Sequence, residues 1–240
     1  MNIIVCENYE EMSKKVAEIA FDIVKNKKDS LISFPGGDTP LGAITEFVKG
    51  VNAGDVSIAD ARFVSLDEWV GLSDTDEGSC GHFLKTNLFN KLEKPFKDAY
   101  ILNGANPSIE DELKAHQEYF NQYGPLDLSV LGVGMNGHLG FNESGVDFAL
   151  DSHVIDLDEV TKKVMVKYFG DTQKPEKGIT QGINQIMNAK TVVIIANGAH
   201  KGDIIKKALQ DAVSNEVPAS CVQNHPNCYV ILDKEAAAKL

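Results

Sequence analysis

Short apolar runs alternate with longer segments of helical periodicity along the whole chain, and this alternation constrains the fold more than any other feature. The runs are apolar at nearly every position, as in TVVIIA at residues 191–196. Strands with that pattern are buried on both faces, which is typical of a parallel sheet with helices on either side. We therefore predict an α/β fold with a mainly parallel sheet flanked by helices.

The same pattern gives approximate positions for the elements. Strands are expected at residues 2–6, 30–34, 61–66, 99–102, 126–133, 152–157, 191–196 and 228–232. Helices are expected at residues 9–28, from about 39, and at 79–92, 108–124, 159–169, 178–187 and 201–212. Ser108 and Asp111 begin one of these helices with the Ser-x-x-Asp form of a capping box. No repeat or Pro/Gly/Ser-rich linker interrupts the pattern, so we predict one domain spanning residues 1–240.

The charge of the chain excludes some classes of partner. A formal net charge of −12 gives a surface that repels polyanions, so we expect neither nucleic acid nor an anionic membrane as a partner. A small phosphorylated ligand is compatible with this charge, because local backbone N–H groups and lysines can oppose the global sign. No basic-then-apolar leader precedes MNIIVC, and no apolar run is long enough to span a bilayer. We expect a cytoplasmic protein.

The cysteines give little sign of a metal or a disulfide framework. Cys6, Cys80, Cys221 and Cys228 include no Cys-x-x-Cys pair. Cys221 and Cys228 flank His225, which is a conceivable metal-binding arrangement. Cysteines at strand edges are more often small buried hydrophobes, and we expect no metal.

In parallel sheets, ligands bind beyond the carboxyl ends of the strands, so the residues that follow each strand are considered together. After the second strand, Gly36 and Gly37 lead into a helix N-terminus, which is an anion-binding arrangement. A tight turn with Thr39 as the N-cap fits equally well. After the third strand, Asp67 and Glu68 are adjacent, so only one of them can face a cleft. That carboxylate could be a general base or part of a solvated turn.

The stretch SVLGVGMNGHLGFNESG at residues 129–145 contains a glycine motif after the fifth strand. Gly132, Gly134 and Gly137 spell G-x-G-x-x-G, the dinucleotide-binding fingerprint. That fingerprint must lead directly into a helix, whereas the glycine-containing stretch HLGFNESG at 138–145 disfavours one. The dinucleotide interpretation therefore fails.

The same loop holds polar residues suited to proton transfer. Asn136, His138 and Glu143 lie within eight residues of one another. Histidine is readily tuned for proton transfer near neutral pH, and a nearby carboxylate could orient its ring. A lone loop histidine is otherwise a surface residue. Lys201, at the start of a later helix, could reach a phosphate or could simply be solvated.

Five ordered motifs resemble one family along almost the whole chain, the glucosamine-6-phosphate deaminase/isomerase family. They are GGDTPLG, SLDEWVGL, LGVGMNGHLGFNE, GITQGINQIMNAK and ANGAHKGDIIKKAL. The resemblance implies a single α/β domain with a modified Rossmann-like arrangement. It also implies conversion of an amino-sugar 6-phosphate and water to a ketose 6-phosphate and ammonia, without a metal or redox cofactor.

The resemblance assigns roles to individual residues. Asp67 matches the family's base, which moves a proton between C2 and C1 of the sugar. His138 matches the acid/base group that opens the ring, and Glu143 matches the carboxylate that works with it. Gly137 would offer its N–H to a ring or anomeric oxygen. The phosphate cradle matches Gly36, Gly37, Thr39 and Lys201.

Several positions depart from the family's pattern, and three of them bear on the proposed site residues. Asn136 replaces an aspartate that relays to the histidine, and an asparagine could still orient the imidazole. Lys167 replaces an arginine that helps to clamp the phosphate, so a bidentate contact would be lost. Asp38 replaces a glycine or a serine-like residue, which puts an acid beside the phosphate loop. These departures leave the sugar open between glucosamine 6-phosphate and galactosamine 6-phosphate.

Two alternatives share the fold. A 6-phosphogluconolactonase has a similar G-x-G-x-x-G-H stretch but does not require the carboxylate of the FNE sequence, and Glu143 and DEWVGL favour the deaminase. A sugar-phosphate-sensing regulator would carry a helix-turn-helix ahead of the sensor, whereas this sequence begins with a strand and opposes DNA by its charge. We expect a sugar phosphate as the ligand, and a monomer or small homo-oligomer.

Overall fold

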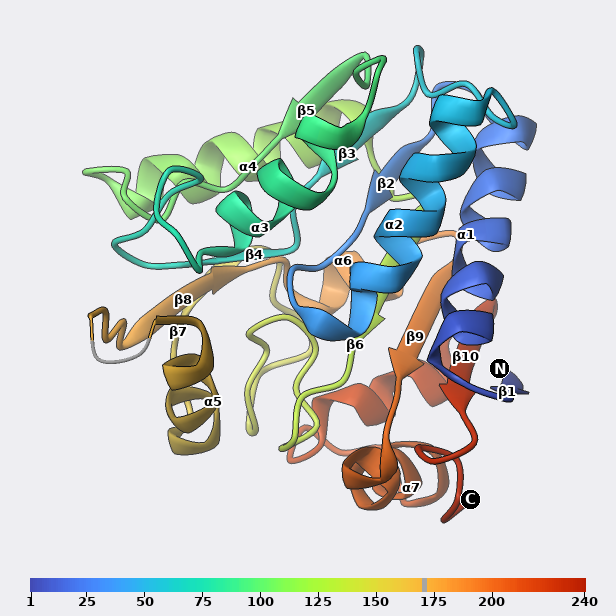
Figure 1. Ribbon diagram of the computed structural model, residues 1–240. Helices are drawn as coiled ribbons and strands as arrows, with labels where there is room; N and C mark the ends of the chain where they lie inside the picture. Colours follow the sequence, from blue (N-terminus) through green and yellow to red (C-terminus); the bar gives the residue numbers. More distant parts are fainter. Residues whose placement is uncertain (170–171) are drawn as a thin grey trace.

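A parallel sheet forms the centre of the molecule in the computed structural model, which describes residues 1–169 and 172–240 (Figure 1). Its seven strands lie in the order β1-β10-β9-β6-β2-β3-β5, and every neighbouring pair is parallel. The prediction of a mainly parallel sheet is confirmed. The strands are β1 (Asn2–Cys6), β2 (Leu31–Ser33), β3 (Arg62–Val64), β5 (Asp98–Tyr100), β6 (Leu128–Gly132), β9 (Val192–Ala196) and β10 (Cys228–Asp233).

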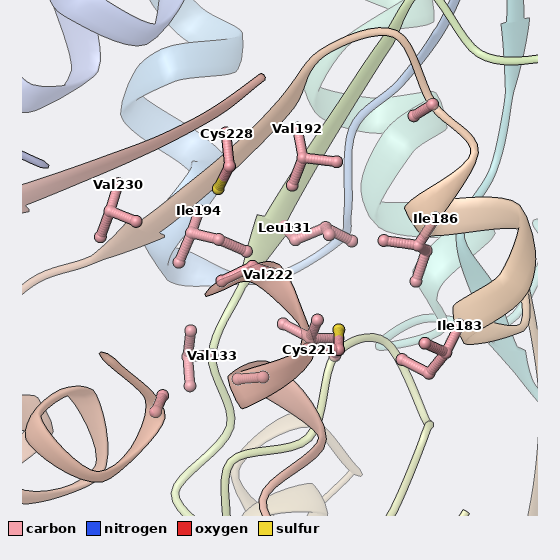
Figure 2. Packing of buried hydrophobic residues seen from close by; sticks show 14 of the residues in the cluster. Leu131, Val133, Ile183, Ile186, Val192, Ile194, Cys221, Val222, Cys228 and Val230 are labelled. Carbon is pink, nitrogen blue, oxygen red and sulfur yellow. The ribbon is translucent and has the colours of Figure 1, made fainter. Parts of the chain in front are cut away.

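Helices cover both faces of this sheet, and successive residues of β9 show how the two cores form. Val193 and Ile195 belong to the core beneath α1 and α2, whereas Val192 and Ile194 belong to the opposite core. Figure 2 shows Val192 and Ile194 among residues of α6 and η3 in that second core. The helices are α1 (Tyr9–Asn26), α2 (Asp38–Ala53), α3 (Cys80–Asn87), α4 (Ile109–Tyr123), α5 (Glu159–Phe169), α6 (Ile183–Met187) and α7 (Gly202–Gln210), with 3-10 segments η1 (Phe89–Lys91), η2 (Ala199–Lys201) and η3 (Pro218–Asn224).

A second, smaller sheet is antiparallel and was not expected from the sequence. Its order is β4-β8-β7, formed by β4 (Asp67–Trp69), β8 (Lys177–Thr180) and β7 (His153–Asp156). The side chains of Trp69, Phe141 and Phe169 pack together between this sheet and α5. The small sheet therefore has a core of its own. It lies beside the main sheet (Figure 1).

The predicted helix at 178–187 is wrong in its first half. Residues 177–180 form β8, and only Ile183–Met187 form a helix. Pairing with both β4 and β7 fixes this segment as a strand, and Gly178 lies so close to the Phe141 ring that a Cβ would clash with it. The other predicted helices are confirmed with shifted ends. Only half of the predicted capping box forms: the Ser108 hydroxyl accepts from the Asp111 N–H, but the Ser108 N–H donates to Oδ1 of Asn106.

The cysteines behave as small hydrophobes. Cys221 and Cys228 are buried and free, and His225 donates from Nε2 to the Ala189 carbonyl at 2.8 Å. Within residues 1–169 and 172–240, no group of three or more His, Cys, Asp or Glu side chains could hold a metal ion. No helix in the same residues is long and apolar enough to cross a bilayer.

One buried carboxylate ties several elements together at the amino end of β6. Asp127 accepts hydrogen bonds from the Leu31 N–H at 2.9 Å, from Lys27 at 2.7 Å and from Lys190 at 2.8 Å. Burial alone would raise the pKa of Asp127, but the bonds from Lys190, Lys27 and Leu31 outweigh it and hold the pKa below its ordinary value. The ionised form of Asp127 therefore stabilises the fold.

We expect Asp127→Asn to lower the free energy of unfolding by about 1–3 kcal/mol at pH 7, because charge-assisted bonds are lost. The folded-state pKa lies below the unfolded one, so the wild-type advantage is present at neutral pH and disappears as pH falls through the folded-state value. Urea unfolding measures both effects. The control is Asp156→Asn, which removes a carboxylate that is 85% exposed and 3.5 Å from Lys177; it should change stability by less than about 0.5 kcal/mol. Equal losses in the two variants would contradict the assignment.

Candidate active site

A cavity of about 470 Å³ opens beyond the carboxyl ends of β2 and β6. This is where ligands bind in parallel α/β sheets. Its walls come from the loop before α2, from β4, from α3, from the segment after β6 and from one face of α5. The predicted site residues that line it are Gly36, Gly37, Asp38, Thr39, Asp67, His138, Lys167 and Lys201. Residues predicted from separate motifs thus line the same cavity.

The N-terminus of α2 faces this cavity without a capping side chain. Gly37 is the N-cap residue, with φ of 112°, a conformation that favours glycine. The alternative with Thr39 as N-cap is wrong, because the helix already begins at Asp38. The Tyr9 hydroxyl donates to the Asp38 carbonyl at 2.8 Å and holds the loop against α1. An uncapped helix start offers its first N–H groups and its positive dipole end to an anion.

Asp67 and Glu68 point to opposite sides of β4, as predicted for adjacent strand residues. Asp67 lines the cavity, and burial raises its pKa to about 6, against smaller lowering effects of the Cys80 thiol and His138. The Glu68 carboxylate accepts from the N–H groups of Trp69, Cys80 and Gly81 at 2.8, 3.2 and 2.7 Å. Glu68 therefore joins β4 to the start of α3, and Asp67 is the carboxylate available to a ligand.

His138 lines the cavity and is backed by a buried carboxylate. Its Nδ1 lies 3.0 Å from Oε2 of Glu143. Burial would raise the pKa of Glu143, but hydrogen bonds from His138, Thr161 and Asn136 lower it below its ordinary value. An ionised carboxylate can only accept, so Nδ1 of His138 donates. The neutral ring consequently has no proton on Nε2, which is then able to accept one from a ligand.

Asn136 acts on Glu143 and not on the imidazole ring. Its Nδ2 donates to Oε2 of Glu143 at 2.7 Å, and its Oδ1 accepts from the backbone N–H of His138 at 3.3 Å. The expected orienting effect on the imidazole is therefore indirect. Among the described residues that line the cavity, His138 is the one member of this trio. Asn136 and Glu143 lie behind it.

The glycine motif is a turn that makes room for His138. A Cβ on Gly134 would lie 2.2 Å from Cδ2 and Nε2 of the His138 ring. The Gly137 N–H donates to the Gly134 carbonyl at 3.0 Å, so the expectation that it is available to a sugar oxygen is wrong. A Cβ on Gly137 would face Val217 and Ile204, away from the cavity. Residues 133–152 contain no helix, which confirms that the motif is not a dinucleotide fingerprint.

Two lysines and an acid occupy the end of the cavity near α2. Lys201, in η2, donates to the Val133 carbonyl at 2.6 Å. Burial, and then the charge of Lys167, lower the pKa of Lys201 to about 8. Lys167, on α5, forms an ion pair with Asp38. Asp38, the acid beside the 36–39 loop, is thus paired with Lys167, the other residue near the phosphate loop that differs from the family's pattern.

Comparison with known proteins identifies the family of the chain. Residues 7–230 match the model of the glucosamine-6-phosphate isomerase/6-phosphogluconolactonase family. The chain belongs to this family. It is 36% identical over 237 residues to a glucosamine-6-phosphate deaminase of Geobacillus sp. (strain WCH70), covering 98% of this chain and 94% of that one. It is also 36% identical over 241 residues to one of Clostridium botulinum (strain Hall), covering 100% and 99%.

Solved structures of family members divide into a near and a more distant set. A monomeric glucosamine-6-phosphate deaminase superposes with a TM-score of 0.95 at 31% identity, over 100% of both chains. The 6-phosphogluconolactonase of Trypanosoma brucei superposes with a TM-score of 0.76 at 18% identity, over 100% of this chain and 98% of that one. At that identity the second likeness shows the shared fold alone.

Several residues that line the cavity were not predicted from the sequence, because most of them lie outside the family motifs. Thr161, Val164 and Tyr168 line the cavity from α5, and His82 and Asn87 line it from α3. The α5 residues stand at positions i, i+3 and i+7 and so share one helix face with Lys167 nearby. That spacing, combined with a predicted role for Lys167, could have identified them. The α3 residues carry no comparable signal.

Gly134→Ala should displace the His138 ring, because the new methyl group would occupy the space of the imidazole. We expect the Nδ1 bond to Glu143 to break and the free energy of unfolding to fall by about 1–3 kcal/mol. Ring ¹⁵N NMR detects the lost bond, and urea unfolding gives the stability. Gly132→Ala is the matched control, since a Cβ there meets nothing within 4 Å. An unchanged His138 spectrum in Gly134→Ala would show that the close approach is not required.

Proposed function

We propose that this chain converts glucosamine 6-phosphate or galactosamine 6-phosphate and water to the ketose 6-phosphate and ammonia. One observation carries the proposal. A single cavity is bordered by the buried carboxylate of Asp67, by His138 backed by Glu143, and by an uncapped helix start beside Lys201. These are the groups that an aldose–ketose proton transfer on a phosphorylated sugar requires. The names of the relatives support the same reaction.

The phosphate group of the substrate is proposed to bind at the start of α2. The N–H groups of the 36–39 loop and the charge of Lys201 would hold it. Lys167 would exchange its partner, from Asp38 to the phosphate, because a dianion competes with a single carboxylate for an ammonium group. Binding at this end fixes the distance between the phosphate and the reacting carbons, which lowers the entropy cost of the reaction.

Ring opening is proposed to use His138. Its unprotonated Nε2 would take the proton of the anomeric hydroxyl and deliver a proton to the ring oxygen as the C1–O bond breaks. Nδ1 stays bonded to Glu143 throughout, so the ionised carboxylate stabilises the imidazolium formed between the two transfers. The product is the open-chain aldehyde.

Isomerisation and deamination are proposed to use Asp67. The carboxylate would remove the proton from C2, and the C2–H electrons would form the C1=C2 bond of an enol-type intermediate while one proton of the C2 ammonium group passes to the C1 oxygen. The proton held by Asp67 would then return at C1 as the nitrogen lone pair forms the bond to C2. The nitrogen is then on a C2 imine, and water adds to that imine and releases ammonia. Only protons and water are exchanged in these steps, so no electron carrier takes part.

The decisive experiment compares three substrates. Purified protein should release ammonia and ketose 6-phosphate in equal amounts from glucosamine 6-phosphate, from galactosamine 6-phosphate, or from both, with a chelator present and no cofactor added. The ratio of kcat/KM for the two epimers assigns the preferred sugar. Hydrolysis of 6-phosphogluconolactone in the absence of any ammonia release would overturn the proposal in favour of a lactonase.

A base must be ionised, so activity should be lost as Asp67 takes up its proton. Burial raises the pKa of Asp67 to about 6 from an ordinary 3.8. We expect kcat/KM to fall about tenfold per pH unit below pH 6. The midpoint should hardly move with temperature, because carboxyl ionisation has a small enthalpy whereas imidazole ionisation has a large one. A midpoint near pH 4, or one with the temperature dependence of an imidazole, would exclude Asp67.

Asp67→Asn should remove turnover and leave binding of the phosphate ester intact, as calorimetry with the substrate can measure. Because the folded-state pKa of Asp67 is the higher one, stability falls as pH rises from about 3.8 to about 6 and the loss is fully present at pH 7. The variant should therefore resist urea at least as well as the wild type at pH 7. A variant that keeps the wild-type rate would exclude Asp67 as the base.

We propose further that residues 1–240 act as one domain, as a cytoplasmic monomer or small homo-oligomer, with a sugar phosphate and no nucleic acid or membrane as partner. The glucosamine-6-phosphate deaminase that superposes with a TM-score of 0.95 is monomeric, which supports the smaller assembly. The net charge of −12 supports the exclusion of polyanions. Sedimentation equilibrium would measure the oligomeric state directly.

A further inference from the structure

Thr161 lies in the first turn of α5 and contacts the His138–Glu143 pair. It bonds Oε1 of Glu143, whereas Asn136 bonds Oε2. Its side chain is buried and lines the cavity. Its hydroxyl donates to Oε1 of Glu143 at 2.6 Å and lies 3.2 Å from Nδ1 of His138. Neither contact was visible in the sequence, since 18 residues separate Thr161 from Glu143 and 23 separate it from His138.

The two oxygens of Glu143 are held by donors from different parts of the chain. Oε2 accepts from Asn136 at 2.7 Å and from His138 at 3.0 Å. Oε1 accepts from Thr161 at 2.6 Å and, at 3.4 Å, from the backbone N–H of Asp158. Without the Thr161 hydroxyl, the long bond from Asp158 is the one that Oε1 would retain among the bonds of the described residues, and rotation of the carboxylate would be opposed mainly by the bonds to Oε2.

The direction of these bonds follows from the chemistry of the groups. The hydroxyl of Thr161 has one proton, and the carboxylate of Glu143 can only accept, so the proton lies between them. A lone pair of Thr161 is then free to accept, and the Nδ1–H of His138 is within reach of both Thr161 and Glu143. The proton on Nδ1 is thus shared by two acceptors, which fixes both the tautomer and the plane of the ring.

The position of α5 explains why this hydroxyl is held so well. Met165 and Phe169, one and two turns further along, are buried against Trp69 in the core of the small sheet. Thr161 is on the same side of the helix at the i−4 position relative to Met165. Lys167 is six residues beyond Thr161, a rise of about 9 Å. One rigid helix therefore carries a contact to the His138–Glu143 pair and the cation proposed for the phosphate.

We propose that Thr161 is a positioning residue for ring opening: its hydroxyl fixes the Glu143 carboxylate and, through it, the orientation and Nδ1–H tautomer of His138. Thr161 need not touch the reacting atoms for this role. The inference rests on the proposed function, because it assigns Thr161 to the same reaction.

The test compares Thr161→Val, which keeps the shape and removes the hydroxyl, with Thr161→Ser, which keeps the hydroxyl. Thr161→Val should lower kcat for ammonia release about 10–100-fold and leave KM within about threefold. Thr161→Ser should restore kcat to within about threefold of the wild type. Thr161→Ala is a second hydroxyl-free variant if the valine protein fails to fold. A valine variant with wild-type kcat, or a serine variant as slow as valine, would overturn the inference.

Thr45→Val is the matched control for the chemistry of the substitution. Thr45 is exposed on α2, and its hydroxyl donates only to the Leu41 carbonyl one turn earlier among the bonds of the described residues. Its replacement should leave kcat and KM unchanged. A loss in Thr45→Val equal to that in Thr161→Val would mean that any helical threonine is equally sensitive, and the inference would fail.

A second readout does not depend on turnover. In the wild type the Nδ1–H proton of His138 should be visible by NMR, and its exchange with water should be at least tenfold faster in Thr161→Val but unchanged in Thr161→Ser. Equal exchange rates in the three proteins would overturn the positioning role. If the wild type releases no ammonia, the proposed function fails, and these exchange rates still decide whether Thr161 positions His138.

Discussion

The active-site geometry depends on one buried pair of residues, Thr180 and Gln181, where β8 leaves the small sheet. The Gln181 N–H donates to the Leu66 carbonyl at 2.8 Å, and its side chain donates to the Ser65 carbonyl at 2.9 Å. Its own carbonyl accepts from the Asn142 side chain at 2.8 Å. The residues just before Asp67 and the loop that follows His138 are therefore bonded to the same two residues. This junction therefore adds to the pairing of β3, β2 and β6 in setting the distance between the proposed base and the ring-opening histidine.

Thr180 closes the junction on the other side. Its hydroxyl accepts from the Phe141 N–H at 3.2 Å, and a Cβ on Gly140 would lie 2.7 Å from that oxygen. Thr180 also pairs with Asp67 across the β4–β8 ladder. The small antiparallel sheet is thus more than a cover for the cavity. It is the element that turns the chain after β3 so that Asp67 faces His138.

The two carboxylates of the site have pKa values shifted in opposite directions, because burial dominates at Asp67 whereas the bonds from His138, Thr161 and Asn136 and the charge of His138 outweigh burial at Glu143. Glu143 is surrounded by donors that lower its pKa despite burial. Asp67 is buried with little such support, and its pKa rises to about 6. A group that must hold a permanent charge beside an imidazolium benefits from the first environment. A group that must both take and return a proton near neutral pH benefits from the second.

The sequence predicted the structure best where the local apolar pattern and the sheet topology agree. It predicted the structure worst where contacts with residues distant in the sequence determine the conformation. Apolar alternation predicted the parallel sheet, and the rule that ligands bind at strand ends brought Asp67, His138 and Lys201 to one edge. The strand at 177–180 could not be predicted in this way, since Ile179, Ile183 and Ile186 also fit a helical period and only the β4 and β7 partners decide. The failed expectation for Gly137 has a similar origin. A glycine-rich motif predicts a loop, but which N–H closes the turn depends on where the Gly134 carbonyl points.

The departures at positions 38 and 167 are best understood as one change, because 129 residues separate them in sequence and an ion pair joins them in the fold. A lysine is a compact point charge that a single carboxylate can satisfy, whereas an arginine would retain donors for a phosphate while bound to an acid. Asp38 therefore compensates Lys167 in the free protein. In the proposed complex the phosphate competes with the Asp38 carboxylate for the Lys167 ammonium group, so part of its binding free energy is offset. The proposed affinity for phosphate then rests on the helix start at Gly37 and on the partly buried Lys201, whose amine donates to the Val133 carbonyl. The proposed anion site thus combines the start of α2 and Lys201 of η2, which each follow a strand of the main sheet, with an exchangeable cation from α5.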